Sequence, residues 1–336
     1  MTSAVERPSS GSLSSLSGGP SADPAELARV FDLVAATVRT AYVGREETVR
    51  LALCCLMAEG HLLVEDFPGL GKTTLAKALA RSLGLGFGRV QFTADLLPAD
   101  ITGAVVIDRD TKLLAFRPGP IFTNVLVADE LNRASPKAQS ALLEAMEERQ
   151  VSVDGTSHFL PRPFMVVATQ NPYDAAGTFP LPHSQLDRFL LRLDIGYPDR
   201  ALEDELLASA ESRPLPEDLP VVAGEGFLES FARAVQHAHV AGEVRGYILD
   251  LVRATRGHPE LAVGASPRAA LAVLRAAAAV AVAAGRGFVT PDDVKQVGPA
   301  ALAHRVVLHP VAPSTAPAVI GEILNRVPVP VARGRA

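Results

Sequence analysis

Residues 61–80 read HLLVEDFPGLGKTTLAKALA, and their pattern is the strongest indication of fold in this chain. The apolar run His61–Glu65 is followed by a loop that contains Gly69 and Gly71, after which Lys72 and Thr73 open a segment with helical spacing of apolar residues. A strand, a glycine-containing loop and a helix in this order allow backbone N–H groups to converge on phosphates at the positive end of the helix. The sequence therefore predicts a phosphate-binding loop.

The residue types in this loop suggest how it would hold a nucleoside triphosphate. We expect Lys72 to contact the β- and γ-phosphates and the Thr73 hydroxyl to bind Mg²⁺. The usual pattern has a further glycine separated from Gly71 by four residues, and here Asp66 occupies that place. Gly69 and Gly71 still permit close approach of the backbone to the phosphates. The predicted nucleotide-binding set is Asp66, Phe67, Pro68, Gly69, Leu70, Gly71, Lys72, Thr73 and Thr74.

A second signal is the stretch NVLVADE at residues 124–130, an apolar run that ends in two carboxylates. We expect Asp129 to bind the magnesium ion through water, and Glu130 to orient and deprotonate the attacking water. Paired acids after a strand are also found at ordinary solvated helix starts. The phosphate-binding loop upstream favours the catalytic interpretation.

Three further residues are candidates for the chemistry. Asn171, in VVATQNP (166–172), is placed to hydrogen-bond the attacking water or the γ-phosphate, although Asn before Pro is common in plain turns. Arg188 ends a helix just before a strand, so we expect it to point towards a neighbouring subunit's site. Arg268 opens an Ala-rich helix and would bring the helical part of the chain onto the nucleotide. Either arginine could instead be an ordinary surface ion-pair partner.

The order of apolar runs predicts an α/β fold. Strands that alternate with helices form a parallel sheet covered on both faces, and ligands of such sheets bind at the carboxyl ends of the strands. We expect a disordered Ser/Gly-rich arm at residues 1–24, an αβα ATPase core at 25–212 and a helical lid at 213–336. Two insertions are predicted, paired short strands within 96–122 and a hairpin at 150–159 that turns at Asp154-Gly155. The candidate strands are His61–Glu65, Arg89–Phe92, Asn124–Asp129, Phe164–Thr169 and Phe189–Asp194.

Composition narrows the class of protein. The net charge of −5 argues against a protein whose main role is coating nucleic acid, because that role needs clustered Lys and Arg. Cys54 and Cys55 are adjacent in an apolar helical run, which predicts small core residues in a reducing cytoplasm. No secretion signal and no transmembrane segment is expected, since the most apolar tract, residues 269–284, is short and contains Arg275.

Taken together, the motifs resemble the MoxR-type AAA+ ATPases. The matching stretches span residues 25–326 and include YVGREETVRLAL (42–53), FRPGPIFTNVLVADELNRASPKAQSALLEAMEERQVSVDG (116–155), GTFPLPHSQLDRFLLRL (177–193) and GASPRAALAVLRAA (264–277). The resemblance implies a P-loop core with a parallel five-stranded sheet, an insert in the second helix, a hairpin before the Asn171 strand and an all-α lid.

By the same resemblance, the motifs assign roles. Asn171 would be the first sensor, Arg188 the arginine finger and Arg268 the second sensor, while Val43 and Gly44 would lie near the adenine. Relatives with the same insert can move the lid so that the second sensor acts on the adjacent subunit, which leaves open the side that Arg268 serves.

The family resemblance also implies a function, namely ATP- and Mg²⁺-dependent, chaperone-like remodelling of protein complexes by a hexamer. The partner would carry a von Willebrand factor A domain, and the task would be maturation of, or metal insertion into, a client enzyme complex. Two alternatives stay open: a nucleic-acid motor, because the same insert occurs in such motors, and a nucleotide-switched scaffold. The acidic balance argues against the first and the intact Glu130 against the second.

Overall fold

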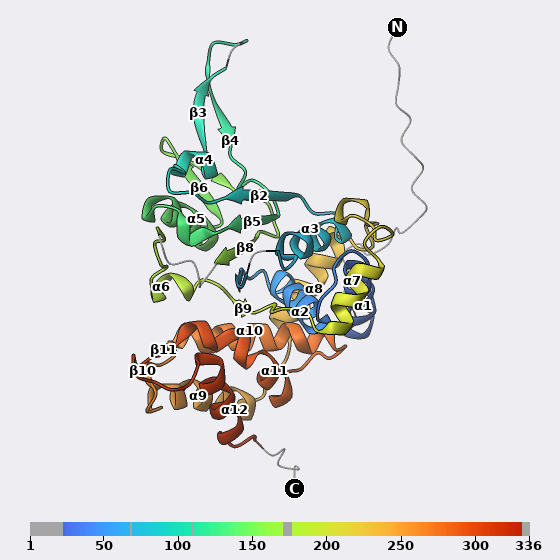
Figure 1. Cartoon of the computed structure of the whole chain (residues 1–336), viewed down its shortest axis with the longest axis vertical. Helices are drawn as coiled ribbons and strands as arrows, with labels where there is room; N and C mark the ends of the chain where they lie inside the picture. Colours follow the sequence, from blue (N-terminus) through green and yellow to red (C-terminus); the bar gives the residue numbers. More distant parts are fainter. Residues whose placement is uncertain (1–22, 68, 109, 171–176, 331–336) are drawn as a thin grey trace.

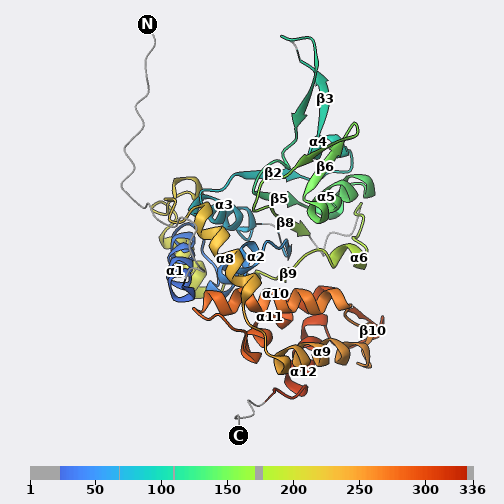
Figure 2. The same ribbon diagram turned by 180° about the vertical axis from the view of Figure 1, so that it is seen from behind.

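The computed structural model describes residues 23–67, 69–108, 110–170 and 177–330. The predicted N-terminal arm lies almost wholly outside these residues, as do two predicted site residues, Pro68 and Asn171. A central sheet lies between helices, and a group of C-terminal helices packs beside it (Figures 1 and 2). This is the predicted α/β architecture.

The main sheet has five parallel strands, as predicted. Each strand lies within two residues of its predicted bounds, because a short apolar run bounded by turn residues marks a buried strand well. In spatial order the strands are β2 (Phe87–Gln91), β5 (Val125–Asp129), β8 (Met165–Gln170), β1 (Leu62–Glu65) and β9 (Leu191–Leu193). The ends of β1, β5 and β8 therefore meet at one edge of the sheet.

The two faces of the sheet are buried in separate hydrophobic clusters. Side chains alternate along a strand, so Val125 and Val127 of β5 belong to one cluster, whereas Leu126 and Ala128 belong to the other. Helices α1 (Pro24–Ala41), α2 (Glu46–Met57) and α3 (Lys72–Ser82) contribute to the first cluster. Helices α4 (Pro98–Thr102) and α5 (Pro136–Glu148) contribute to the second.

Both predicted insertions are hairpins. The first pairs β3 (Gly103–Ile107) with β4 (Leu114–Pro118) and projects from the body of the molecule (Figure 1). The second pairs β6 (Gln150–Val153) with β7 (Thr156–Phe159). Asp154 and Gly155 both have positive φ, which is what a two-residue hairpin turn requires.

The C-terminal part is mostly helical, as predicted, and it also contains a short antiparallel strand pair and an isolated β-bridge between His239 and Phe288. Ser266 and Thr290 cap the helices Pro267–Ala283 (α10) and Pro291–Leu302 (α11) through their hydroxyls. The elements are α6 (His183–Leu186), α7 (Arg200–Ala208), α8 (Glu225–His237), α9 (Gly242–Arg256), β10 (Leu261–Val263), α10 (Pro267–Ala283), α11 (Pro291–Leu302), β11 (Val307–Leu308) and α12 (Ala316–Arg326), with short 3₁₀ turns at Leu131–Arg133, Pro216–Asp218 and Ala303–Arg305.

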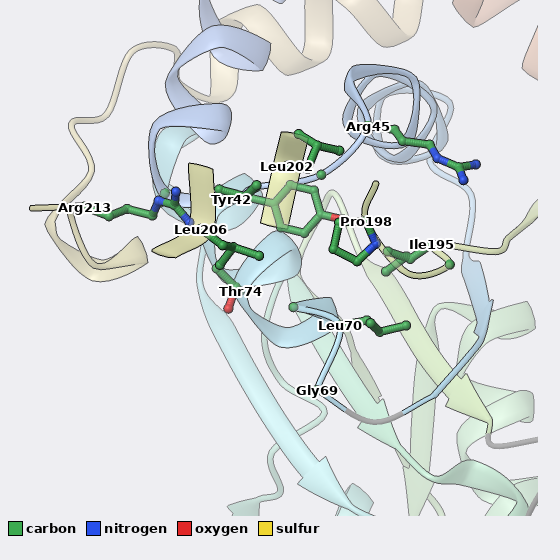
Figure 3. Close-up of a pocket in the computed structure, with 15 residues that line it drawn as sticks. Tyr42, Arg45, Gly69, Leu70, Thr74, Ile195, Pro198, Leu202, Leu206 and Arg213 are labelled. Atoms are coloured by element: carbon green, nitrogen blue, oxygen red, sulfur yellow. The ribbon is translucent and has the colours of Figure 1, made fainter. Parts of the chain in front are cut away.

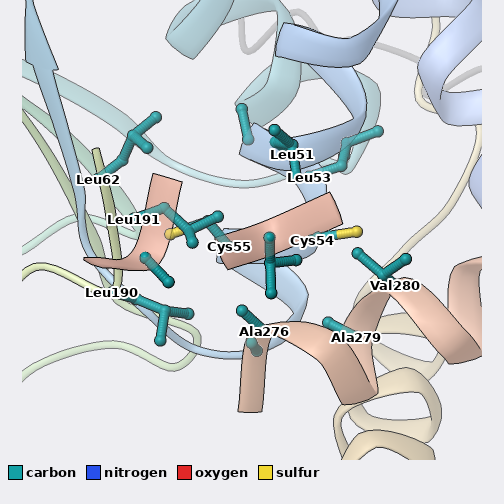
Figure 4. Packing of buried hydrophobic residues seen from close by; sticks show 14 of the residues in the cluster. Leu51, Leu53, Cys54, Cys55, Leu62, Leu190, Leu191, Ala276, Ala279 and Val280 are labelled. Atoms are coloured by element: carbon teal, nitrogen blue, oxygen red, sulfur yellow. The ribbon is translucent and has the colours of Figure 1, made fainter. Parts of the chain in front are cut away.

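Helix α10 joins the lid to the core through apolar contacts. Its Ala-rich face packs on α1 and α2, so the first cluster runs from the sheet into the lid without a break. Cys54 and Cys55 lie in this interface as free thiols (Figure 4). Burial raises the pKa of Cys54 to about 12, so this thiol stays neutral and serves as a small core residue, as expected. No described helix combines the length and the apolarity needed to cross a bilayer.

Candidate functional site

The loop after β1 takes a backbone shape that favours glycine. Gly69 and Gly71 have φ of +84° and +76°, in the left-handed region that other residues rarely adopt. Gly71 caps α3, and its carbonyl accepts the first helical hydrogen bond, from Leu75 N, at 2.8 Å. A Cβ added at Gly71 would lie 3.2 Å from the Tyr42 ring. Both the turn and the close packing thus select glycine at this helix N-terminus.

Lys72 lies at the start of α3, among carboxylates. Its Nζ donates to the Asp66 carbonyl at 2.6 Å. Burial lowers the pKa of Lys72, while the negative charges of Asp66, Asp129 and Glu130 act in the opposite direction. The Lys72 ammonium therefore lies within electrostatic range of Asp129 and Glu130 as well as Asp66.

The two acids at the end of β5 are fixed by the neighbouring strand. Thr169 Oγ1, at the end of β8, accepts from Glu130 N at 2.9 Å and donates to Asp129 Oδ1 at 3.2 Å. Glu130 has φ of +55°, a strained conformation for a residue with a side chain. One buried hydroxyl thus holds both members of the acidic pair.

Each acid also has an arginine partner. Asp129 Oδ2 accepts from Arg89 Nε of β2 at 2.6 Å, and Glu130 pairs with Arg133 at 2.8 Å. Each carboxylate therefore has a cationic partner within the chain. A magnesium ion on Asp129 would replace or share the contact with Arg89.

The loop and the acids line one cleft of about 370 Å³ at the carboxyl edge of the sheet. The cleft brings together Lys72, Thr73, Asp129 and Glu130, with the end of β8 beside them. The loop residues and the acids are more than 50 positions apart in the sequence, and the parallel order of the strands brings them together. Its described lining is Asp66, Gly69, Leu70, Gly71, Lys72, Thr73, Thr74, Arg89, Gln91, Asp129, Glu130, Thr169 and Gln170.

A second cavity of about 270 Å³ adjoins the cleft and shares Gly69, Leu70, Gly71 and Thr74 with it. Both residues expected near the adenine, Val43 and Gly44, line this cavity. Its wall is largely apolar and is completed from α7 and the segment before it. The remaining lining residues are Ala41, Tyr42, Arg45, Ile195, Gly196, Pro198, Leu202, Leu206 and Arg213.

Tyr42 lies among these residues (Figure 3), and its hydroxyl is buried with no hydrogen-bond partner among the described residues. Burial, with the nearby charge of Asp66, raises the pKa of Tyr42 to about 12. The hydroxyl is therefore neutral and can donate one hydrogen bond. A buried group of this kind is costly unless a partner satisfies it.

Asp66 stands where the usual loop pattern has glycine, and its carboxylate organises the loop. One oxygen accepts from Phe67 N at 2.8 Å and the other from Gly196 N at 2.5 Å. The Phe67 ring packs on Tyr197 with centroids 5.3 Å apart. Asp66 thus ties the phosphate-binding loop to the segment between β9 and α7.

Comparison with known proteins agrees with this geometry. Residues 61–191 match the ATPase family associated with various cellular activities (AAA), and residues 253–324 match the AAA lid domain. The chain is 39% identical to the chaperone MoxR1 of Mycobacterium tuberculosis over 280 residues, which covers 81% of this chain and 74% of the relative. The chain belongs to the MoxR family of AAA+ ATPases.

Two further matches extend over most of the chain. The uncharacterized protein YeaC of Bacillus subtilis is 46% identical over 295 residues, 87% of this chain and 92% of the relative. A crystal structure of a candidate ATPase from Cytophaga hutchinsonii superposes with a TM-score of 0.86 at 32% identity, covering 92% of this chain and 97% of the other. The likeness therefore includes the helical lid of this MoxR-family chain.

The two predicted arginines lie together, away from the phosphate-binding loop. Both line a cavity of about 380 Å³ with Gly60 and His61, which precede β1, whereas the loop follows β1. Arg268 was expected to bring the helical lid onto the nucleotide. Within one chain it lies beside Arg188, and neither arginine lines the loop cleft or the adjoining cavity. The lid packs α10 at the amino end of β1, which carries Arg268 with it.

Sequence reasoning missed four residues around these sites: Thr169, Arg89, Tyr42 and Glu147. Thr169 lay inside the quoted VVATQNP motif, and its place at a strand end next to the acidic pair was a usable signal. Arg89 and Tyr42 gave no separate signal, since one reads as a strand residue and the other as the end of an apolar helix. Glu147 is one of several charged residues in EAMEER and could not be singled out.

Proposed function

We propose that this MoxR-family chain hydrolyses ATP in the cleft between the phosphate-binding loop and the acidic pair. The observation that carries the proposal is that Lys72 and Thr73 share one cleft with Asp129 and Glu130. The adjoining apolar cavity suits the base and ribose, because a nucleotide that spans both cavities would cross the shared Gly69–Gly71 backbone.

The donor set at the cleft fits Mg²⁺. The Thr73 hydroxyl and the Asp129 carboxylate are hard oxygen ligands, and both line the cleft. When bound with ATP, the metal ion neutralises charge on the β- and γ-phosphates. Lys72 would add a positive charge at the same phosphates, and the loop N–H groups would orient them.

Glu130 is proposed to act on the attacking water. Glu130 lines the cleft and pairs there with Arg133 at 2.8 Å, so release of that ion pair would free the carboxylate for the water. There it would orient the water and accept its proton as the bond to the γ-phosphate forms. Asn171 is proposed to hydrogen-bond the same water or the γ-phosphate, and Tyr42 to donate its free hydroxyl to the nucleotide.

The position of the arginines favours a ring. Arg188 and Arg268 lie at the opposite end of β1 from the loop, so they would reach the nucleotide of an adjacent subunit. We propose a hexamer that remodels protein complexes in the cytoplasm. Its partner would carry a von Willebrand factor A domain, and its task would be maturation of, or metal insertion into, a client enzyme complex.

Steady-state ATP turnover by the purified chain tests the proposed activity. We expect Mg²⁺-dependent release of phosphate, no turnover by Glu130→Gln and no ATP binding by Lys72→Ala. Turnover that survives in Glu130→Gln would refute the role given to that carboxylate. Filter binding with DNA at low salt tests the motor alternative, which predicts tight and strongly salt-dependent retention.

A further inference from the structure

The cavity that holds the two arginines is rich in ionised groups. Five arginines and three carboxylates line it, so its formal charge is positive. Three of the arginines have partners of their own. Arg149 donates to the Phe164 and Glu59 carbonyls at 3.1 and 2.5 Å, Arg275 pairs with Glu59 at 3.7 Å, and Arg305 pairs with Asp187 at 2.7 Å.

The remaining two arginines share a single carboxylate. Glu147 pairs with Arg188 at 3.0 Å through one oxygen and with Arg268 at 2.7 Å through the other. Arg188 belongs to the ATPase core, whereas Arg268 belongs to α10 of the lid. Within the part of the chain that the structure describes, Glu147 is the ion partner of both. One side chain therefore joins arginines from two parts of the molecule.

The location of Glu147 is not explained by helix stability. It lies in the last turn of α5, where the helix dipole disfavours a negative charge by a few tenths of a kcal/mol. Its pKa is nevertheless lowered, mainly by the hydrogen bond from Arg268. Helix α5 is packed into the second core cluster through Leu142, Leu143 and Met146, so the carboxylate is held on a rigid element.

The arginines remain open to a second molecule. The exposed fractions of the side chains are 27% for Arg188 and 50% for Arg268. Without the shared carboxylate, the positive charges of the two neighbouring guanidinium groups would repel each other and the side chains would move apart. With it, both guanidinium groups lie beside one carboxylate: Arg268 donates a hydrogen bond to it, and Arg188 Nε forms an ion pair without a hydrogen bond among the described residues. A triphosphate can accept from two arginines held in this way.

We propose that Glu147 is a positioning residue that holds Arg188 and Arg268 side by side for the nucleotide bound to the adjacent subunit. This inference rests on the proposed ATPase function. Glu147 of α5 would then belong to the nucleotide site of the adjacent subunit, and Arg188 and Arg268 would act there as a pair. Loss of Glu147 would leave both arginines present but misplaced, and a displacement of about 1 Å can cost roughly 100-fold in rate.

Rings that contain two kinds of variant chain can distinguish a positioning role of Glu147 from a role in folding. A donor chain with Lys72→Ala cannot bind ATP but keeps its arginines, and an acceptor chain with Arg188→Ala keeps its own cleft. Each is expected to be inactive alone, whereas a mixture regains turnover, because donor arginines serve acceptor clefts. Glu147→Gln is then added to one chain or to the other, and kcat and KM of the mixture are measured.

We expect Glu147→Gln in the donor to lower the regained kcat by roughly 10- to 100-fold with little change in KM. The same substitution in the acceptor should change kcat by less than about twofold. Glu148→Gln in the donor is the matched control, because Glu148 is the next residue of α5, is exposed and forms no ion pair with any described residue. The control should leave the regained rate intact.

Results that would overturn the inference can be told apart from a failure of the proposed function. Equal losses with Glu147→Gln in donor and acceptor would show a structural role and overturn the inference. Unchanged or higher turnover with the substituted donor would also overturn it, as would parent chains that fail to restore each other. Failure of the proposed function itself would be seen earlier, as an absence of ATP turnover by the unsubstituted chain. Thermal unfolding of each variant checks that the chains are folded.

Discussion

The buried hydroxyl of Thr169 is the clearest link between the stability of the sheet edge and the proposed chemistry. Thr169 is 4% exposed, accepts from Glu130 N and donates to Asp129. Thr169→Val keeps the shape of the side chain but removes both hydrogen bonds. It leaves the Glu130 N–H without its partner, at a cost of about 1–3 kcal/mol in the free energy of unfolding.

The same substitution should affect turnover more than ATP binding. Glu130 is held at a φ of +55°, a conformation that costs about 1–3 kcal/mol and persists only where neighbours enforce it. Release of that constraint would let the Glu130 carboxylate shift, with a loss in kcat of roughly 100-fold for a displacement near 1 Å. The dissociation constant of ATP should change little, because Lys72 and the loop are untouched.

Urea denaturation followed by circular dichroism, together with steady-state ATP turnover, measures both effects. Thr169→Ser is the control, since it keeps the hydroxyl and loses only a methyl group. We expect the serine variant to retain most of the turnover of the unsubstituted chain. If Thr169→Val matched the unsubstituted chain in both assays, the hydroxyl would not be holding the acidic pair.

Three other outcomes follow from the same geometry. Lys72→Ala should abolish binding of a fluorescent ATP analogue, whereas Glu130→Gln should bind it and retain it; equal retention by both variants would contradict the roles given to them. Gly71→Ala should lower the free energy of unfolding in urea by about 1–2 kcal/mol through left-handed strain, and more than Gly69→Ala, because a Cβ at Gly71 meets a tyrosine ring whereas one at Gly69 has open space. Burial lowers the pKa of His61 from 6.5 to about 3, so His61 binds a proton in the unfolded chain at a higher pH than in the folded chain. The free energy of unfolding should therefore fall as the pH drops from 6.5 to about 3. His61→Asn should make the pH dependence of the urea midpoint shallower, and an unchanged dependence would show that the ring is not responsible.

The sequence was most informative where a local pattern has one structural meaning. Short apolar runs such as Asn124–Asp129 marked the strands, and Asp154-Gly155 marked the second hairpin, because each depends on residues adjacent in the chain. The grouping of Lys72 with the acidic pair also followed from local patterns. Parallel strands carry such residues to a common edge whatever the sequence between them.

Contacts between distant elements could not be predicted in this way. The pairing of Glu147 with Arg188 and Arg268 depends on how the lid packs on the core, which no short pattern encodes. The carboxylate of Asp66 bonds to Gly196, 130 positions away, so its structural role was invisible beside the missing glycine. Which nucleotide Arg268 would serve, that of its own subunit or that of a neighbour, depends on the packing of α10 and was left open for the same reason.

A structure of the Glu130→Gln chain with ATP and Mg²⁺ would show where the nucleotide binds. We predict the β- and γ-phosphates within hydrogen-bonding distance of Lys72 Nζ, with the metal ion beside the Thr73 hydroxyl and Asp129. A nucleotide bound elsewhere on the chain, with the contact between Arg89 and Asp129 still in place, would refute the proposed ATP site.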